Sequence, residues 1–66
     1  MITFLVNDMS CNHCVGSITA AVKAVDADAT IAIDLPRHLV QIEPDTASAG
    51  RLREAIADAG YTPTAL

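Results

Sequence analysis

Hydrophobic residues occupy alternate positions along residues 2–6, so that Ile2, Phe4 and Val6 share one face of the chain. A period of two is typical of a half-buried strand. From Cys14 onward the period lengthens to that of an amphipathic helix of about three turns. The apolar face of this helix comprises Val15, Ile18, Val22 and Val25.

Two further strands are predicted on either side of a turn at residues 36–38. The aspartates of segment 26–28 break the first helix, and alternation then resumes with Ile31, Ile33 and Leu35. Beyond the turn, alternation continues through residues 39–43, with Val40 and Ile42 on one face. Pro44 and Asp45 end this segment. We therefore expect an antiparallel hairpin.

A second helix and a short last strand complete the pattern. Ser48 is placed to cap the helix at its N-terminus, and Gly60 to end it. The last strand, residues 61–66, contains Pro63, which confines it to a sheet edge. The predicted apolar face of the second helix comprises Leu52, Ala55, Ile56 and Ala59.

The order β-α-β-β-α-β predicts an α+β fold of the ferredoxin-like type, a four-stranded antiparallel sheet with both helices on one face. Because 66 residues suffice for only one hydrophobic core, we expect residues 1–66 to form a single domain. Tracing the chain through this fold brings three connections to one end of the molecule. They are residues 8–13, the turn at 36–38, and residues 60–61.

Composition narrows the range of functions. A chain of this length has little room for a large substrate cleft, which argues against an enzyme. Eight acidic residues against four basic ones, with Phe4 and Tyr61 as the only aromatics, argue against a nucleic-acid partner. No apolar run approaches the roughly 20 residues of a membrane span, and residues 1–8 lack the features of a secretion signal. We expect a cytoplasmic protein without membrane insertion.

The candidate chemistry lies in residues 9–14, Met-Ser-Cys-Asn-His-Cys, between the first strand and the first helix. Cys11 and Cys14 can both turn toward one ion at a helix entrance, where the helix dipole favours thiolate. Thiolates select soft metals, and two sulfurs suit the near-linear coordination that Cu(I) accepts. Such an open site lets a partner's thiolate enter, so metal is transferred by ligand exchange. Hg(II) would also accept two sulfurs.

The Met-x-Cys-x-x-Cys motif between the first strand and first helix, with Gly60 and Tyr61 after the second helix, resembles the heavy-metal-associated domain family, most closely its stand-alone bacterial copper chaperones. The resemblance spans essentially the whole chain. It implies that Cys11 and Cys14 bind the metal, that Met9 packs beneath the loop, and that Tyr61 lies near the site.

The chain departs from the family pattern at Asp8, where a glycine usually precedes the methionine. Asp8 is interpreted as a loop residue, although its carboxylate could instead supply an oxygen ligand to a divalent ion. Zinc-preferring relatives tend to carry aspartate directly before the first cysteine, and here that residue is Ser10. We therefore expect the bound metal to be Cu(I) rather than Zn(II).

Other residues near the motif are predicted either to have an ordinary structural role or to act as secondary groups at the metal, and the possible secondary groups are Met9, Ser10, His13 and Tyr61. His13 is expected to be solvated, with binding to a shared or excess copper ion as the alternative. His38 is expected at the surface. Met9 is expected to pack rather than ligate. Tyr61 is expected either to pack in the core or to shield the sulfurs from water.

The resemblance implies a Cu(I) chaperone that delivers copper to the metal-binding domain of a copper-transporting P-type ATPase or to a copper-responsive regulator. In this hypothesis Cys11 is attacked first and Cys14 holds the ion longer. We expect an apo monomer, with a metal-bridged dimer left open. A small thiol oxidoreductase also stays open, because CxxC at a helix start suits disulfide exchange. An excised transporter domain is disfavoured by Met1 and by the lack of a linker.

Overall fold

Four strands and two helices alternate in the predicted order in the computed structural model, which describes residues 1–10 and 12–66. These elements are β1 (Ile2–Val6), α1 (Asn12–Val25), β2 (Thr30–Asp34), β3 (Leu39–Glu43), α2 (Ala49–Asp58) and β4 (Pro63–Ala65).

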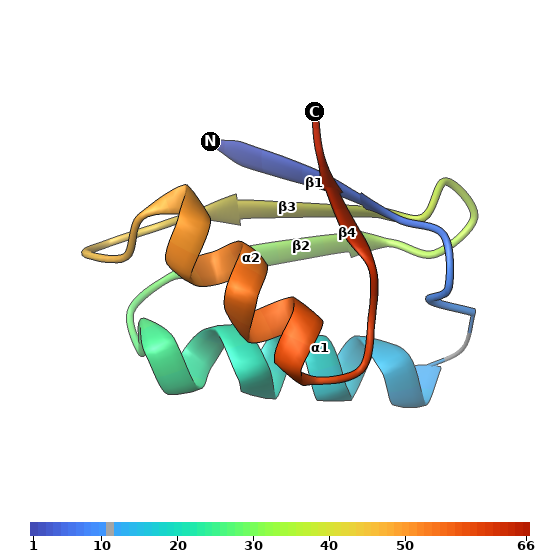
Figure 1. The fold of residues 1–66 in the computed structure, drawn as a ribbon, viewed down its shortest axis with the longest axis horizontal. Coiled ribbons are helices and arrows are strands. Elements are labelled where there is room, and N and C mark those ends of the chain that lie inside the picture. The colour runs from blue at the N-terminus through green and yellow to red at the C-terminus, as the bar shows by residue number, and fades with distance from the viewer. Residues whose placement is uncertain (11) are drawn as a thin grey trace.

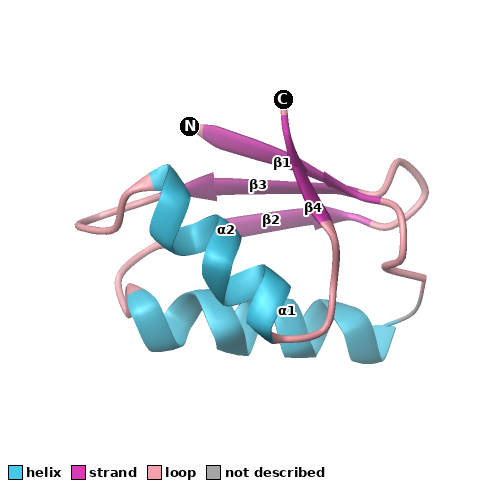
Figure 2. Ribbon diagram, viewed as in Figure 1, coloured by secondary structure: helices cyan, strands magenta, loops and turns pink. Residues whose placement is uncertain are grey.

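The strands form one sheet in the order β2-β3-β1-β4, in which every neighbouring pair is antiparallel. Both helices lie on the same side of this sheet (Figure 1), and Figure 2 separates the two layers by colour. The predicted ferredoxin-like α+β architecture is thereby confirmed. Pro63 begins the edge strand β4, where a residue without a backbone N–H is tolerated.

The core lies between the sheet and the helices and consists mainly of aliphatic side chains. Alternate residues of β1 and β3 point into it, and every fourth residue of the helices faces it. Neither helix in the described part of the chain is long and apolar enough to cross a membrane. The buried apolar residues are Phe4, Val6, Met9, Cys14, Ile18, Val22, Ala29, Val40, Ile42, Leu52 and Ile56.

Helix α1 is longer than its hydrophobic pattern predicted. Its 14 residues begin at Asn12, because exposed residues of the first turn leave no trace in the pattern. The buried stripe runs through Cys14, Ile18 and Val22, whereas Val15 and Val25 are only half-buried. Cys14 therefore lies on the packed face of the helix, where the periodicity had placed its neighbour Val15.

Three further boundaries differ from the prediction. Leu35 lies beyond the end of β2, in the turn, although it still packs against the core. Ala59 was assigned to the buried face of α2 but is the exposed C-cap residue, because the helix ends before it. Strand β4 occupies only residues 63–65 of the predicted segment 61–66.

The caps predicted for α2 are confirmed. The side chain of Ser48 accepts a hydrogen bond from the Arg51 amide at 3.2 Å, which satisfies one of the unpaired donors of the first turn. At the other end, Gly60 has φ of 101°, a conformation that side-chain-bearing residues rarely adopt. The amides of Gly60 and Tyr61 then bond back to Ala57 and Ile56. This cap turns the chain toward β4.

Asp26, which was predicted only to break the first helix, is buried at the end of α1. Its Oδ2 accepts hydrogen bonds from the amides of Asp45, Thr46 and Ala47 at 2.8, 2.9 and 3.1 Å. The bonds from Ala47 and Thr46 lower the pKa of Asp26 from its usual 3.8, against the opposing effect of burial. Asp26 thus fastens the segment between β3 and α2 to the first helix.

Acid is therefore expected to weaken the fold through Asp26. A carboxyl whose folded pKa is depressed stabilises the protein above its unfolded pKa, near 3.8, and loses this contribution as the pH falls through the folded value. Asp26→Asn should lower the thermal midpoint at about pH 6 and flatten the decline of stability toward about pH 3. Thermal unfolding across that range, followed by circular dichroism, tests both effects.

The matched control is Asp28→Asn, which neutralises an exposed aspartate two residues away. We expect its pH dependence to follow that of the wild type. Equal losses in the two variants would indicate a general charge effect and contradict the anchoring role of Asp26.

Candidate metal-binding site

Three connections meet at the end of the molecule where β1 leads into α1, as predicted. The backbone amide of Val6 donates to the carbonyl of His38 in the β2–β3 hairpin at 2.8 Å. The amide of Thr62, between α2 and β4, donates to Asp8 Oδ1 at 3.1 Å. The segment after β1 is therefore held on one side by the hairpin and on the other by the connection to the last strand.

Cys14 is the third residue of α1 and lies at the limit of the core, with 9% of its surface exposed. Amides of the first helical turn have no partner within the helix, so this position favours a negatively charged sulfur. A side chain fixed by packing holds its donor atom in a defined direction. Cys14 is thus a positioned candidate ligand rather than a mobile surface thiol.

Cys11, the other predicted ligand, lies outside the described residues. The convergence of two sulfurs on one ion therefore stays a prediction for this chain. Among the residues described, which do not include Cys11, no group of three or more His, Cys, Asp or Glu side chains is placed to hold a metal ion.

The other residues of the motif, and Tyr61, differ in how far they are buried. Met9 is fully buried in the core, in agreement with the packing role expected of it. Ser10 and His13 are exposed. Tyr61 is half-buried and packs against the core. Whether Ser10, His13 or Tyr61 acts on a bound metal stays a prediction.

His38 was expected to be a surface residue, and the structure corrects this prediction in part. The side chain is partly buried, and its Nδ1 lies 2.8 Å from the carbonyl oxygen of Met9. Because a carbonyl only accepts, Nδ1 must be the donor. The predicted position of the hairpin at this end of the fold was the available signal for this contact. The sequence alone does not show which residues 29 positions apart touch.

The backbone of His38 is also unusual, with φ of 57° in the left-handed region. Its amide donates to the Leu35 carbonyl at 3.1 Å and so closes the turn of residues 35–38. His38 is the left-handed residue at the end of this turn. Glycine is the usual choice there, since a side chain costs roughly 1–2 kcal/mol in that conformation. The chain nevertheless carries a histidine at this position.

Asp8 acts within the protein. Its carboxylate accepts the Thr62 amide, so it links the segment before the motif to the connection that carries Tyr61. This agrees with the interpretation of Asp8 as a loop residue and adds a definite contact to it. A glycine at the same place could not make this bond.

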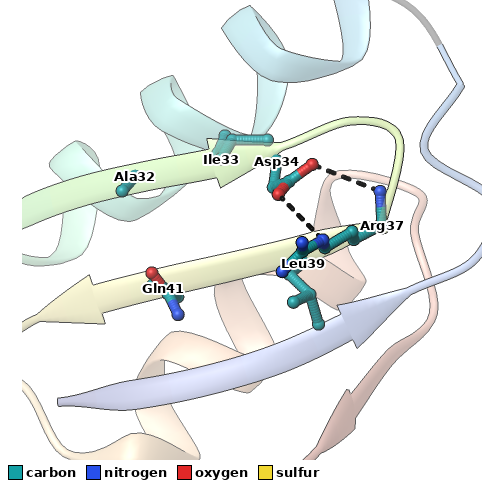
Figure 3. Close-up of a pocket in the computed structure, with 6 residues that line it drawn as sticks. All are labelled: Ala32, Ile33, Asp34, Arg37, Leu39 and Gln41. Atoms are coloured by element: carbon teal, nitrogen blue, oxygen red, sulfur yellow. Dashed lines mark hydrogen bonds and ion pairs between the residues drawn. The ribbon is translucent and has the colours of Figure 1, made fainter.

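A surface hollow over β2 and β3 lies apart from the motif (Figure 3). At its rim the Asp34 carboxylate accepts the Arg37 amide at 3.2 Å and pairs with Arg37 Nε at 3.7 Å. Leu39 and Gln41, which line it, alternate with the buried Val40 and therefore belong to the sheet face away from the helices. None of the described residues that line the hollow carries a thiol or an imidazole, and we assign no metal site to it.

Known proteins resemble this chain over most of its length. Residues 3–62 match the model of the heavy-metal-associated domain. The COP-associated protein of Helicobacter felis is 42% identical over 57 residues, covering 85% of this chain and 86% of the relative.

Two solved structures share the fold at comparable length. The copper chaperone Atx1 from Synechocystis PCC6803 superposes with a TM-score of 0.91 at 34% identity, covering 97% of this chain and all of its own. A gold binding protein superposes with a TM-score of 0.92 at 29% identity, covering 100% of both chains. The likeness therefore extends over the whole fold.

Proposed function

The chain belongs to the heavy-metal-associated domain family, and from this we propose that it is a metal carrier that binds one Cu(I) ion through Cys11 and Cys14 and hands it to another protein. The observation that carries the proposal is the placement of Cys14. Its thiol lies in the first turn of α1, fixed by core packing at the boundary with solvent.

Ligand chemistry favours Cu(I) in this proposal. A two-thiolate site provides the soft donors and low coordination number that a monovalent d10 ion accepts. Tetrahedral Zn(II) would need two more ligands. The family relatives point in the same direction, since one solved structure is that of a copper chaperone and another binds gold, also a soft metal. Hg(II) stays the alternative that uses the same two sulfurs.

Transfer rather than storage is proposed because a two-coordinate ion leaves room for a third thiolate. A partner with its own cysteine pair would enter this position, and the ion would move without release into water. We propose as recipient a copper-transporting P-type ATPase, through its metal-binding domain, or a copper-responsive regulator. In such an exchange Cys14, held by α1, would keep its bond longer than Cys11.

The test is a competitive titration of the reduced protein with Cu(I), Zn(II) and Hg(II), followed by native mass spectrometry. We expect one Cu(I) per chain, retained against a large excess of Zn(II). A preference for Zn(II), or no metal bound by the reduced protein, would overturn the proposal. Incubation of the Cu(I) form with the purified metal-binding domain of a copper ATPase then tests transfer, which we expect to proceed in the presence of a chelator that captures released copper.

A further inference from the structure

The hairpin residue His38 occupies a place that neither the motif nor the family likeness explains. Its backbone carbonyl accepts from Val6 at the end of β1, and its imidazole reaches the carbonyl of Met9. One residue of the β2–β3 turn thus contacts the chain both before and within the motif. The 2.8 Å length of each contact is that of a well-formed hydrogen bond.

The direction of the imidazole bond defines the state of the ring. Since the Met9 carbonyl can only accept, the Nδ1 atom carries a proton. The neutral ring is then the Nδ1–H tautomer, with its lone pair on Nε2. His38 makes this contact from a left-handed backbone conformation, at a position where glycine would be less strained.

We propose that His38 is a positioning residue for metal binding, which fixes Met9 and Ser10, the two residues before the CxxC motif, by donating from Nδ1 to the Met9 carbonyl. Three constraints then act on this segment. They are the burial of Met9, the bond from Met9 N to Val6 O at 3.2 Å, and the bond from His38. The consequence for copper rests on the proposed function, whereas the fixing of the segment does not.

A fixed segment matters because a ligand that is already oriented loses less freedom when the metal binds. Groups that orient metal ligands through hydrogen bonds typically contribute 10–100-fold to affinity. His38 acts one step further away, through the backbone before the motif. We therefore expect an effect near the lower end of that range, about tenfold.

Two substitutions separate the side-chain bond from the backbone conformation. His38→Gly removes the donor while keeping a residue that favours positive φ. His38→Asn keeps the tolerance for that conformation and places an amide nitrogen where Nδ1 stands, at the same distance from Cβ. Arg37→Ala is the matched control, because it alters an exposed residue of the same hairpin without touching Met9.

The first readout uses the apo protein. We expect nuclear magnetic resonance to show the Nδ1–H tautomer of His38 in the wild type. We also expect the Met9 amide to exchange with solvent faster in His38→Gly, with the amides of β3 unchanged. His38→Asn and Arg37→Ala should exchange like the wild type. An Nε2–H tautomer, or equal exchange in wild type and His38→Gly, would overturn the positioning role.

The second readout is Cu(I) affinity measured against a chelator. We expect about a tenfold loss in His38→Gly, with the wild-type value restored in His38→Asn. An unchanged affinity in His38→Gly would overturn the inference for metal binding. If the wild type itself bound no Cu(I), the proposed function would fail, while the apo readout would still decide whether His38 fixes the segment.

Discussion

Replacing both Cys11 and Cys14 with serine is expected to abolish tight Cu(I) binding while leaving the fold intact. Hydroxyl groups are hard, neutral donors at physiological pH and cannot replace thiolates for a soft ion. Either single replacement should lower the affinity by more than about 100-fold, since even outer-shell partners of a metal contribute up to that amount. Competition with a strong Cu(I) chelator measures the loss.

The burial of Cys14 requires a second variant beside the serine replacement. A serine hydroxyl at a position only 9% exposed carries a desolvation cost of about 1–3 kcal/mol if it finds no partner. Cys14→Ala removes the ligand but keeps an apolar surface toward Ile18 and the core. Both variants should lose copper alike, because neither side chain offers a thiolate. Tight binding retained in a folded Cys14→Ala protein would contradict the assignment of Cys14 as a ligand.

The hydrophobic pattern predicted the elements well because burial repeats locally along each of them. Strand β1 and the caps at Ser48 and Gly60 depend on neighbours within a few residues, so the sequence contains their signal. The start of α1 was missed because Asn12 and His13 face solvent and interrupt no apolar pattern.

The contacts that shape the candidate site join residues far apart in the sequence, so a local pattern could not predict them. The partner of His38 lies 29 residues away, and that of Asp8 lies 54 residues away. Asp26 likewise binds amides about 20 residues ahead of it. Such bonds exist only once the sheet has brought distant loops together. A sequence therefore suggests which loops meet, whereas the structure decides which side chain faces which backbone group.

The largest effect on stability is expected from Phe4→Ala. Phe4 is 1% exposed on β1, a central strand that pairs with both β3 and β4. Removing a buried phenyl ring typically costs about 3–5 kcal/mol, because the surroundings collapse only partly into the cavity. A domain of this length has about 3–10 kcal/mol in total, so this substitution should remove a large share of the free energy of unfolding. Urea unfolding followed by circular dichroism measures the loss.

The control for Phe4 is its neighbour Leu5, which points to the opposite face of the same strand and is only half-buried. Leu5→Ala should cost about 1 kcal/mol, the typical effect of a substitution outside the core. Both variants are compared as reduced apo proteins, because a bound metal would add its binding energy to the folded state. Equal losses would mean that the two faces of β1 contribute alike, against the one-sided core. Since β1 leads directly into the segment that His38 and Asp8 hold, loss of this strand should also disturb the candidate site around Cys14.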